Sequence, residues 1–143
     1  MKPWTYLRIA SVLTLVHSAM HTIGGVFGAA PPGPASVAEA AMKANQFQFL
    51  GATRTFWEFH RGLGLAVTIF LTAEGVVFWL LASLAKHDAV ALRPILAVFM
   101  LGYFAFAVDS LVYFFALPVV FEVLIALCLG LALAGARTAT AAR

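Results

Sequence analysis

The sequence predicts an all-α, polytopic membrane protein in which four transmembrane helices form an up-down-up-down bundle. Two observations predict this class. Of the 143 residues, 63% are hydrophobic and only 10% are charged, whereas a water-soluble domain has about a quarter of its residues charged. The apolar residues also fall into four long stretches that are apolar on every side, as expected for helices that face lipid.

The first apolar stretch predicts a helix over residues 7–27. At about 20 residues it matches the hydrocarbon core of a bilayer, which is about 30 Å thick. Its start, with Lys2 and Arg8 before an apolar run, also resembles a signal peptide. Because His17 and His21 interrupt that run, a permanent transmembrane helix is favoured over a cleaved leader.

Residues 28–55 are predicted to form an extracytoplasmic loop. Three prolines within residues 31–34 remove backbone donors and cannot continue a helix. Ser36 is followed three residues later by Glu39, which is the spacing of a capping box. The loop is therefore expected to contain a short helix over residues 37–45.

The remaining spans are predicted over residues 56–85, 94–116 and 119–135. A short charged turn separates the first two, and Pro94 suits the first turn of the helix that follows it. Pro118 marks a tight connection before the last span. Nothing in the composition divides the chain, so residues 1–143 are predicted to form a single transmembrane domain.

Lys and Arg residues are more frequent on one side of these spans, and the positive-inside rule places that side in the cytoplasm. With a cytoplasmic N-terminus, this side carries Lys2, Arg8, Lys86, Arg93, Arg137 and Arg143. The opposite side carries Lys43, Arg54 and Arg61. The sequence therefore predicts that both termini are cytoplasmic.

Several ionisable side chains fall within the predicted spans. A charged group at the centre of a bilayer costs about 2.5–3.5 kcal/mol on insertion scales, so it is retained where it faces a partner or a cavity. Counting about 1.5 Å per residue from the predicted helix ends places most of these groups toward the outer leaflet. We therefore predict an outer-leaflet polar pocket bounded by His17, His21, Glu58, Arg61, Asp109, Tyr113 and Glu122.

A structural interpretation of the same residues stays open. Arg61 and Glu58 are three residues apart on one helix, a spacing that allows an ion pair. Arg61 could equally pair with Asp109 or Glu122 and thereby fix how the helices pack. Glu74 falls on another stripe of the second helix, where we expect either a protonated carboxyl that is hydrogen-bonded to a neighbouring helix or a contact in an oligomer.

Metal and cofactor binding are not favoured. His17 and His21 are four residues apart, which lets two imidazoles reach one metal ion, but no HExxH or second HxxxH motif accompanies them. Haem held between His60 and either His21 or His17 is disfavoured because His60 is predicted to face elsewhere. Nucleic acid is not an expected partner, since the net charge of +3 comes from dispersed basic residues.

Four segments follow one another along the chain: Leu7-Arg-Ile-Ala10, His21-Thr-Ile-Gly-Gly25, Thr53-Arg-Thr-Phe-Trp-Glu-Phe59 and Tyr113-Phe-Phe-Ala-Leu-Pro118. In these segments and their order the chain resembles a family of small bacterial four-helix membrane proteins without an assigned activity. The resemblance covers nearly the whole chain. It implies a multi-pass protein of the bacterial inner membrane and leaves the activity open.

Three functions are compatible with these observations. The first is a binding module that takes a small amphipathic, lipid-like ligand, with Arg61 and His21 meeting its polar end. The second is an intramembrane acid/base enzyme of isomerase or cyclase type, with Asp109 or Glu122 as the catalytic carboxyl. The third is a structural subunit, and here a second copy of the chain is an expected kind of partner.

Overall fold

The computed structural model describes residues 1–141, with side chains as far as residue 136. Four of its helices are long and apolar enough to cross a membrane: Pro3–Val26, Phe56–Leu84, Arg93–Tyr113 and Ala116–Ala136. The predicted all-α class with four spans is therefore confirmed. Arg143 and the side chain of Arg137, both used above to predict orientation, lie outside this description.

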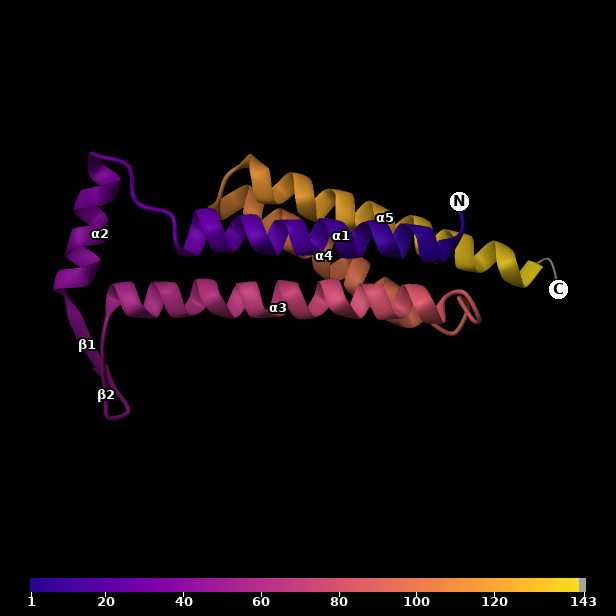
Figure 1. Ribbon diagram of the computed structural model, residues 1–143, viewed down its shortest axis with the longest axis horizontal. Coiled ribbons are helices and arrows are strands. Elements are labelled where there is room, and N and C mark those ends of the chain that lie inside the picture. Colours follow the sequence, from indigo (N-terminus) through magenta and orange to yellow (C-terminus); the bar gives the residue numbers. More distant parts are fainter. Residues whose placement is uncertain (142–143) are drawn as a thin grey trace. The chain divides into compact units, whose positions relative to one another are not determined.

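Figure 1 shows the order of the elements along the chain. They are α1 (Pro3–Met20), the π-helix η1 (His21–Val26), α2 (Pro34–Ala44), β1 (Gln46–Phe49), β2 (Ala52–Thr55), α3 (Phe56–Leu84), α4 (Arg93–Tyr113) and α5 (Ala116–Ala141). Pro118 lies inside the first turn of α5 rather than before it, where its missing N–H has no intrahelical partner to lose. The last helix also continues six residues beyond the predicted end at residue 135.

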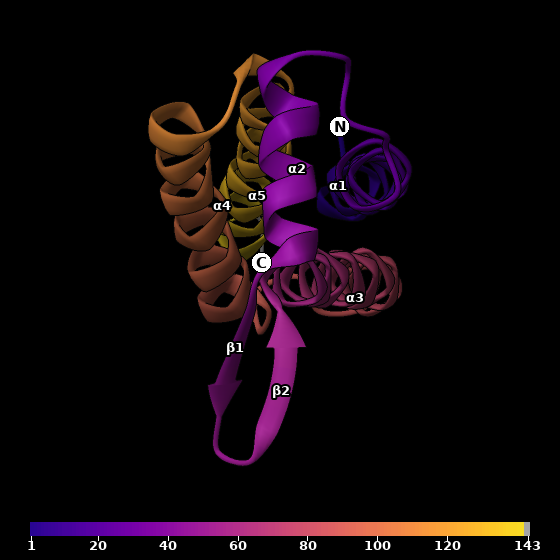
Figure 2. The same ribbon diagram turned by 90° about the vertical axis from the view of Figure 1, so that its left-hand side faces the viewer.

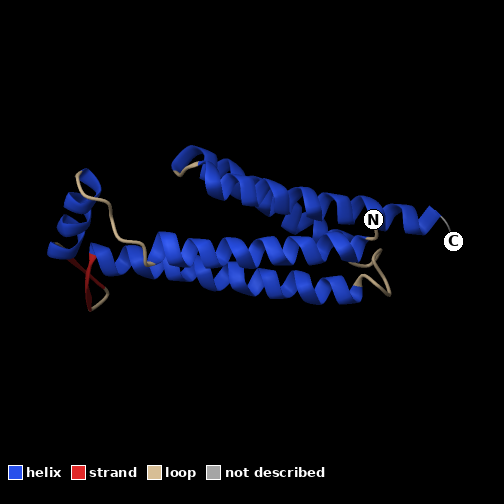
Figure 3. Ribbon diagram, turned by 45° about the horizontal axis from the view of Figure 1, so that its top comes forward, coloured by secondary structure: helices blue, strands red, loops and turns tan. Residues whose placement is uncertain are grey.

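The chain forms two compact units, which are described separately. The bundle unit consists of Met1–His17 and Leu71–Arg143, and the hairpin unit consists of Ser18–Phe70. The helices α1 and α3 are each divided between the units, with one segment in the bundle unit and another in the hairpin unit. Figure 3 distinguishes the helices of both units from the strands, which belong to the hairpin unit.

The bundle unit packs all four spanning helices around one apolar core. Its largest fully buried apolar side chains are Leu7, Phe78, Leu96, Ile125 and Leu129. Many leucines and phenylalanines on the outside of the same helices are exposed, as lipid-facing side chains would be. The core thus holds the helices together while the exterior remains apolar.

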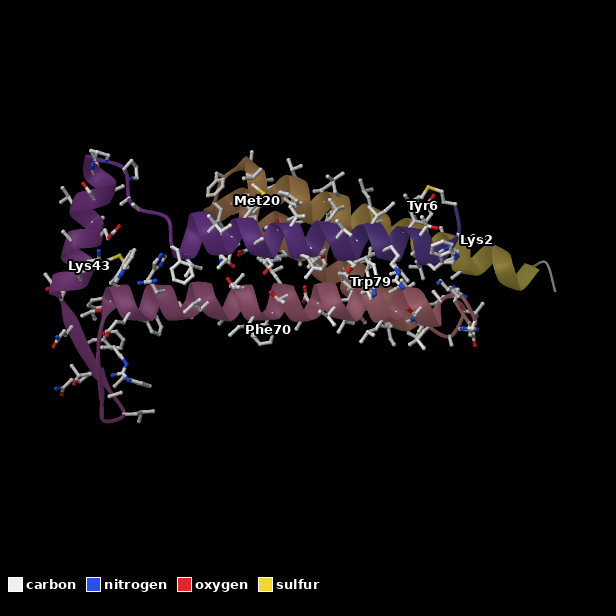
Figure 4. All side chains as sticks on the ribbon, in the orientation of Figure 1. Lys2, Tyr6, Met20, Lys43, Phe70 and Trp79 are labelled. Atoms are coloured by element: carbon white, nitrogen blue, oxygen red, sulfur yellow. The ribbon has the colours of Figure 1, made fainter. Side chains whose placement is uncertain are left out.

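One end of the bundle unit gathers the start of α1, the turn between α3 and α4, and the last described side chains of α5. The Lys86 ammonium lies 5.3 Å from the ring centre of Trp4, and Pro3 lies against Gly135. At the same end, the Arg8 guanidinium lies 3.4 Å from the ring centre of Trp79, and Figure 4 labels Lys2, Tyr6 and Trp79 toward it. Consecutive spans therefore alternate in direction.

A glycine allows α1 and α3 to approach closely within the bundle unit. A Cβ added at Gly75 would lie 2.7 Å from Leu15 Cγ, and the Ser11 hydroxyl donates a 2.6 Å hydrogen bond to the Gly75 carbonyl. Backbone contact of this kind is typical of helix pairs in membranes.

In the hairpin unit, α2 runs across the direction of α3 (Figures 1 and 2). The predicted short helix is present, but it begins at Pro34 with Gly33 as its N-cap, so the assignment of Ser36 as N-cap was wrong. The Ser36 hydroxyl instead donates to the Gly33 carbonyl and accepts from the Gly33 N–H. Proline in the first helical turn explains the earlier start.

A two-stranded antiparallel hairpin follows α2, in a loop where no strands were predicted. Leu50 and Gly51 form its turn with φ values of 47° and 82°, the left-handed conformations of a type I′ turn. A leucine in this region costs about 1–2 kcal/mol. The alternation Gln-Phe-Gln-Phe before the turn was the available signal, since period two is typical of a strand.

Candidate functional site

A row of polar contacts joins the end of α1 and η1 to the first half of α3 in the hairpin unit. The Ser18 hydroxyl donates to the Thr68 carbonyl at 3.1 Å, and the Thr22 and Thr68 hydroxyl oxygens lie 3.0 Å apart. His21 Nε2 lies 3.1 Å from the Gly64 carbonyl oxygen. Since Gly64 and Thr68 are four residues apart, these contacts follow one face of α3.

Arg61 lies on the same face, three residues before Gly64. Its guanidinium carbon is 4.9 Å from the ring centre of Phe27, and the side chain is half-buried. No carboxylate forms an ion pair with Arg61 in the described part of the chain. Among the described residues, this cation in a spanning segment is thus faced by an aromatic ring and has no carboxylate within ion-pair distance.

Glu58 does not form the ion pair that the sequence allowed with Arg61. Its Oε2 accepts hydrogen bonds from the Thr55 backbone N–H at 2.7 Å and from the Thr55 hydroxyl at 3.1 Å. The Glu58 N–H in turn bonds the Thr55 hydroxyl at 3.0 Å. This reciprocal arrangement caps the start of α3, so the role of Glu58 is to begin the helix.

The π-helix η1 brings Phe27 to Arg61. The Phe27 N–H bonds the Thr22 carbonyl five residues earlier at 3.0 Å, which widens the helix at its end. A regular α-helix would bond four residues back and direct Phe27 elsewhere. Single π-helical turns are frequent at functional sites, and no periodicity in the sequence predicted this one.

The remaining acid near Arg61 is already paired. Glu39 forms an ion pair with Lys43, four residues later on α2, and Lys43 also lies 5.0 Å from the ring centre of Trp57. Figure 4 labels Lys43 beside the start of α3. The hydrogen bond from Lys43 lowers the pKa of the Glu39 carboxyl, and the charge of Arg61 adds to that effect.

In the bundle unit, Glu122 is completely buried. Its Oε1 accepts a 2.8 Å hydrogen bond from the Ser110 hydroxyl, while its Oε2 is buried without a hydrogen-bond partner. Asp109 and Tyr113, which were predicted to face the same pocket, are exposed. The structure therefore does not bury these two side chains beside Glu122, because Ser110 occupies the inward position of α4, and their role in a pocket stays a prediction.

A second acid of the bundle unit, Glu74, is half-buried. The Tyr103 hydroxyl donates a 2.7 Å hydrogen bond to Glu74 Oε2, and its oxygen lies 3.4 Å from the Thr14 hydroxyl oxygen. The expected bond from Glu74 to a neighbouring helix is confirmed. The sequence analysis did not find Tyr103, Thr14 and Ser110 as partners.

The two histidines considered for metal binding have different surroundings. The His17 ring stacks on Phe121 with ring centres 5.2 Å apart, whereas His21 contacts the Gly64 carbonyl. Within residues 1–141, no three His, Cys, Asp or Glu side chains are grouped as metal ligands would be.

The fold and these side chains define a class of protein: a multi-pass helical membrane protein with acids, imidazoles and a guanidinium in its spanning segments. Comparisons with known proteins found no matching family model, curated protein or solved structure. The resemblance to small bacterial four-helix membrane proteins therefore stays a prediction, as does the orientation with both termini in the cytoplasm.

Proposed function

We propose that the protein binds a small amphipathic, lipid-like molecule with an acidic head group near the start of α3, in the outer leaflet. Arg61 binds the head group in this proposal, and Phe27 with its neighbouring apolar residues contacts the chain. The observation that carries the proposal is the Arg61 guanidinium, half-buried within a span, stacked on Phe27 and without a carboxylate partner among the described residues.

The position of Arg61 suits a ligand at the boundary between head groups and hydrocarbon. Arg61 is five residues after the start of α3, which is about 7.5 Å along the helix. A guanidinium there is desolvated in part, and an acidic group can meet it with two parallel hydrogen bonds. Such a ligand would supply a negative charge to Arg61, because the Glu58 carboxylate bonds Thr55 and the Glu39 carboxylate pairs with Lys43.

The surface beside Arg61 can accommodate an alkyl chain. Large apolar side chains are exposed on this side of the first half of α3 and directly after η1: Phe27, Leu65 and Ile69. The adjacent polar row keeps the backbone of α3 and the His21 ring in place through the Gly64 contact. An amphipathic molecule would thus find a fixed cation and an apolar surface side by side.

A binding assay with matched ligands tests this proposal. Lysophosphatidic acid and lysophosphatidylcholine of equal chain length are added to the purified protein in mild detergent, and the melting temperature is measured. The acidic lipid should raise it, since a ligand at a hundred times its Kd stabilises the folded state by about 2.7 kcal/mol. The zwitterionic lipid should have little effect.

Variants identify the residue responsible. Arg61→Gln should abolish the shift with the acidic lipid, whereas Arg54→Gln, a matched exposed arginine of the same unit, should retain it. An equal shift in wild type and Arg61→Gln, or no shift in the wild type, would refute Arg61 as the binding residue.

One observation favours a second candidate, an intramembrane acid/base enzyme. Glu122 is completely buried and has one oxygen without a hydrogen-bond partner, which a substrate or transferred proton could occupy. Infrared difference spectra would identify its band by comparison with Glu122→Gln. A catalytic acid or base should exchange its proton around neutral pH, and a band that stays constant there would exclude this candidate.

A further inference from the structure

The hairpin formed by β1 and β2 has two chemically different faces. In its register Phe47 pairs with Arg54 and Phe49 with Ala52, and paired residues lie on the same face of a sheet. The intervening pairs, Gln46 with Thr55 and Gln48 with Thr53, form the other face. One face is thus apolar with a single cation, and the other is uncharged and polar.

The apolar face of the hairpin packs against the first residues of the spanning helix α3. Phe47 contacts Phe56 with ring centres 5.1 Å apart, and it contacts Phe59 at 5.6 Å. Phe59 lies nearly one turn further into the span than Phe56. Because Phe49 shares a face with Phe47, its side chain points in the same direction.

The tip of the hairpin is the most exposed apolar part of this unit. Leu50 is 92% exposed and Phe49 is 69% exposed. Figures 1 and 2 show the hairpin extending sideways from the start of α3, across the direction of that helix. Leu50 also occupies a left-handed turn position that asparagine or glycine would adopt more easily, so the backbone does not explain its presence.

We infer that this hairpin is a membrane anchor, with Phe49 and Leu50 inserted at the boundary of head groups and acyl chains in the leaflet where α3 begins. Two observations support a lipid surface as its partner. The strand β2 ends directly before a spanning helix, and Phe47 on the apolar face contacts Phe56 and Phe59 at the start of that span. Aromatic and basic residues are the usual anchors at this depth.

Spin labelling with a matched pair of positions tests the anchor. Single cysteines replace Phe49 or Gln48 in a Cys128→Ala parent, each is spin-labelled, and the full-length protein is reconstituted in vesicles of phosphatidylcholine and phosphatidylglycerol. The two positions are adjacent but lie on opposite faces, and both are exposed. Circular dichroism checks that the helices are retained.

The accessibility of each label to oxygen and to a water-soluble nickel complex is then measured. We expect the label at position 49 to collide mainly with oxygen, which dissolves in the bilayer, and the label at position 48 to collide mainly with nickel. Equal nickel accessibility at both positions would overturn the inference. Shielding of position 49 from both reagents, with dipolar broadening between labels, would also overturn it by revealing a contact between copies.

Discussion

On α4, the side chains that face the core are not the ones that the sequence placed in the pocket. Helical spacing placed Asp109 and Tyr113 in the predicted pocket, whereas Tyr103, Ala107 and Ser110 are the buried residues. In a helix surrounded by lipid, both faces are apolar, so the usual contrast between a polar and an apolar side is absent. Sequence alone could identify the acids of the candidate site, but it could not orient α4.

Replacing Ser110 should therefore destabilise the protein more than replacing Asp109. Ser110→Ala leaves Glu122 Oε1 buried without its hydrogen bond, which costs about 1–3 kcal/mol. Asp109→Asn changes an exposed side chain and should alter stability by no more than about 0.5 kcal/mol. Equilibrium unfolding in mixed detergents measures both, and a larger loss for Asp109→Asn would reverse the assigned orientation of α4.

Gly75 is a second residue whose size should matter. A Cβ at this position would lie 2.7 Å from Leu15, so Gly75→Ala should force α1 and α3 apart locally. Overpacking costs about 1–3 kcal/mol, and a gain of up to about 1 kcal/mol in helix propensity offsets part of it.

Gly102→Ala is the matched control, because nothing lies within 4 Å of an added Cβ there. This variant should be as stable as the wild type or slightly more stable. The same unfolding assay should rank Gly75→Ala below Gly102→Ala, and equal stability of the two would show that the close approach at Gly75 is unimportant.

At the scale of elements, the long helices were predictable and the short elements were not. Runs of about 20 apolar residues have few alternatives to a spanning helix, so the start of α3 at Phe56 was predicted correctly. The hairpin has strands of four residues, which is too short for a clear pattern. The π-helix η1 depends on a shift of backbone hydrogen bonds that side-chain periodicity does not encode.

The stability of α2 should depend on pH through Glu39. Because Lys43 lowers the pKa of Glu39 in the folded protein below 4.5, the ion pair contributes fully above 4.5 and is lost as pH falls through the lowered value. Hydrogen-exchange protection of α2, corrected for intrinsic rates, should be constant near neutrality and decrease only in this acidic range. In Lys43→Gln the decrease should be smaller, and an identical profile would exclude the pair as its cause.

At the scale of the whole molecule, the described residues contain four candidate spans. The contacts of Trp4 with Lys86 and of Pro3 with Gly135 bring the start of α1 and the later part of α5 to the same end of the bundle unit. The number of spans followed from hydropathy alone. The partners of the buried acids did not, because they come from helices distant in sequence. Arg61 was identified from the sequence because a guanidinium is conspicuous in an apolar span.

Reporter fusions should establish the orientation. Green fluorescent protein should fluoresce when fused at either terminus, and alkaline phosphatase should be active when inserted at the Leu50–Gly51 turn. The excess of Lys and Arg at the terminal side predicts this result. The reverse pattern would place Arg61 in the inner leaflet and contradict the predicted topology.

Native mass spectrometry of the protein released gently from its own membrane tests the central proposal most directly. Wild-type protein should carry an acidic amphipathic molecule that survives mild activation, and Arg61→Gln should be released without it while Arg54→Gln retains it. Wild type and Arg61→Gln with the same bound species, or a wild-type chain that is always bare, would contradict a ligand held by the unpaired guanidinium.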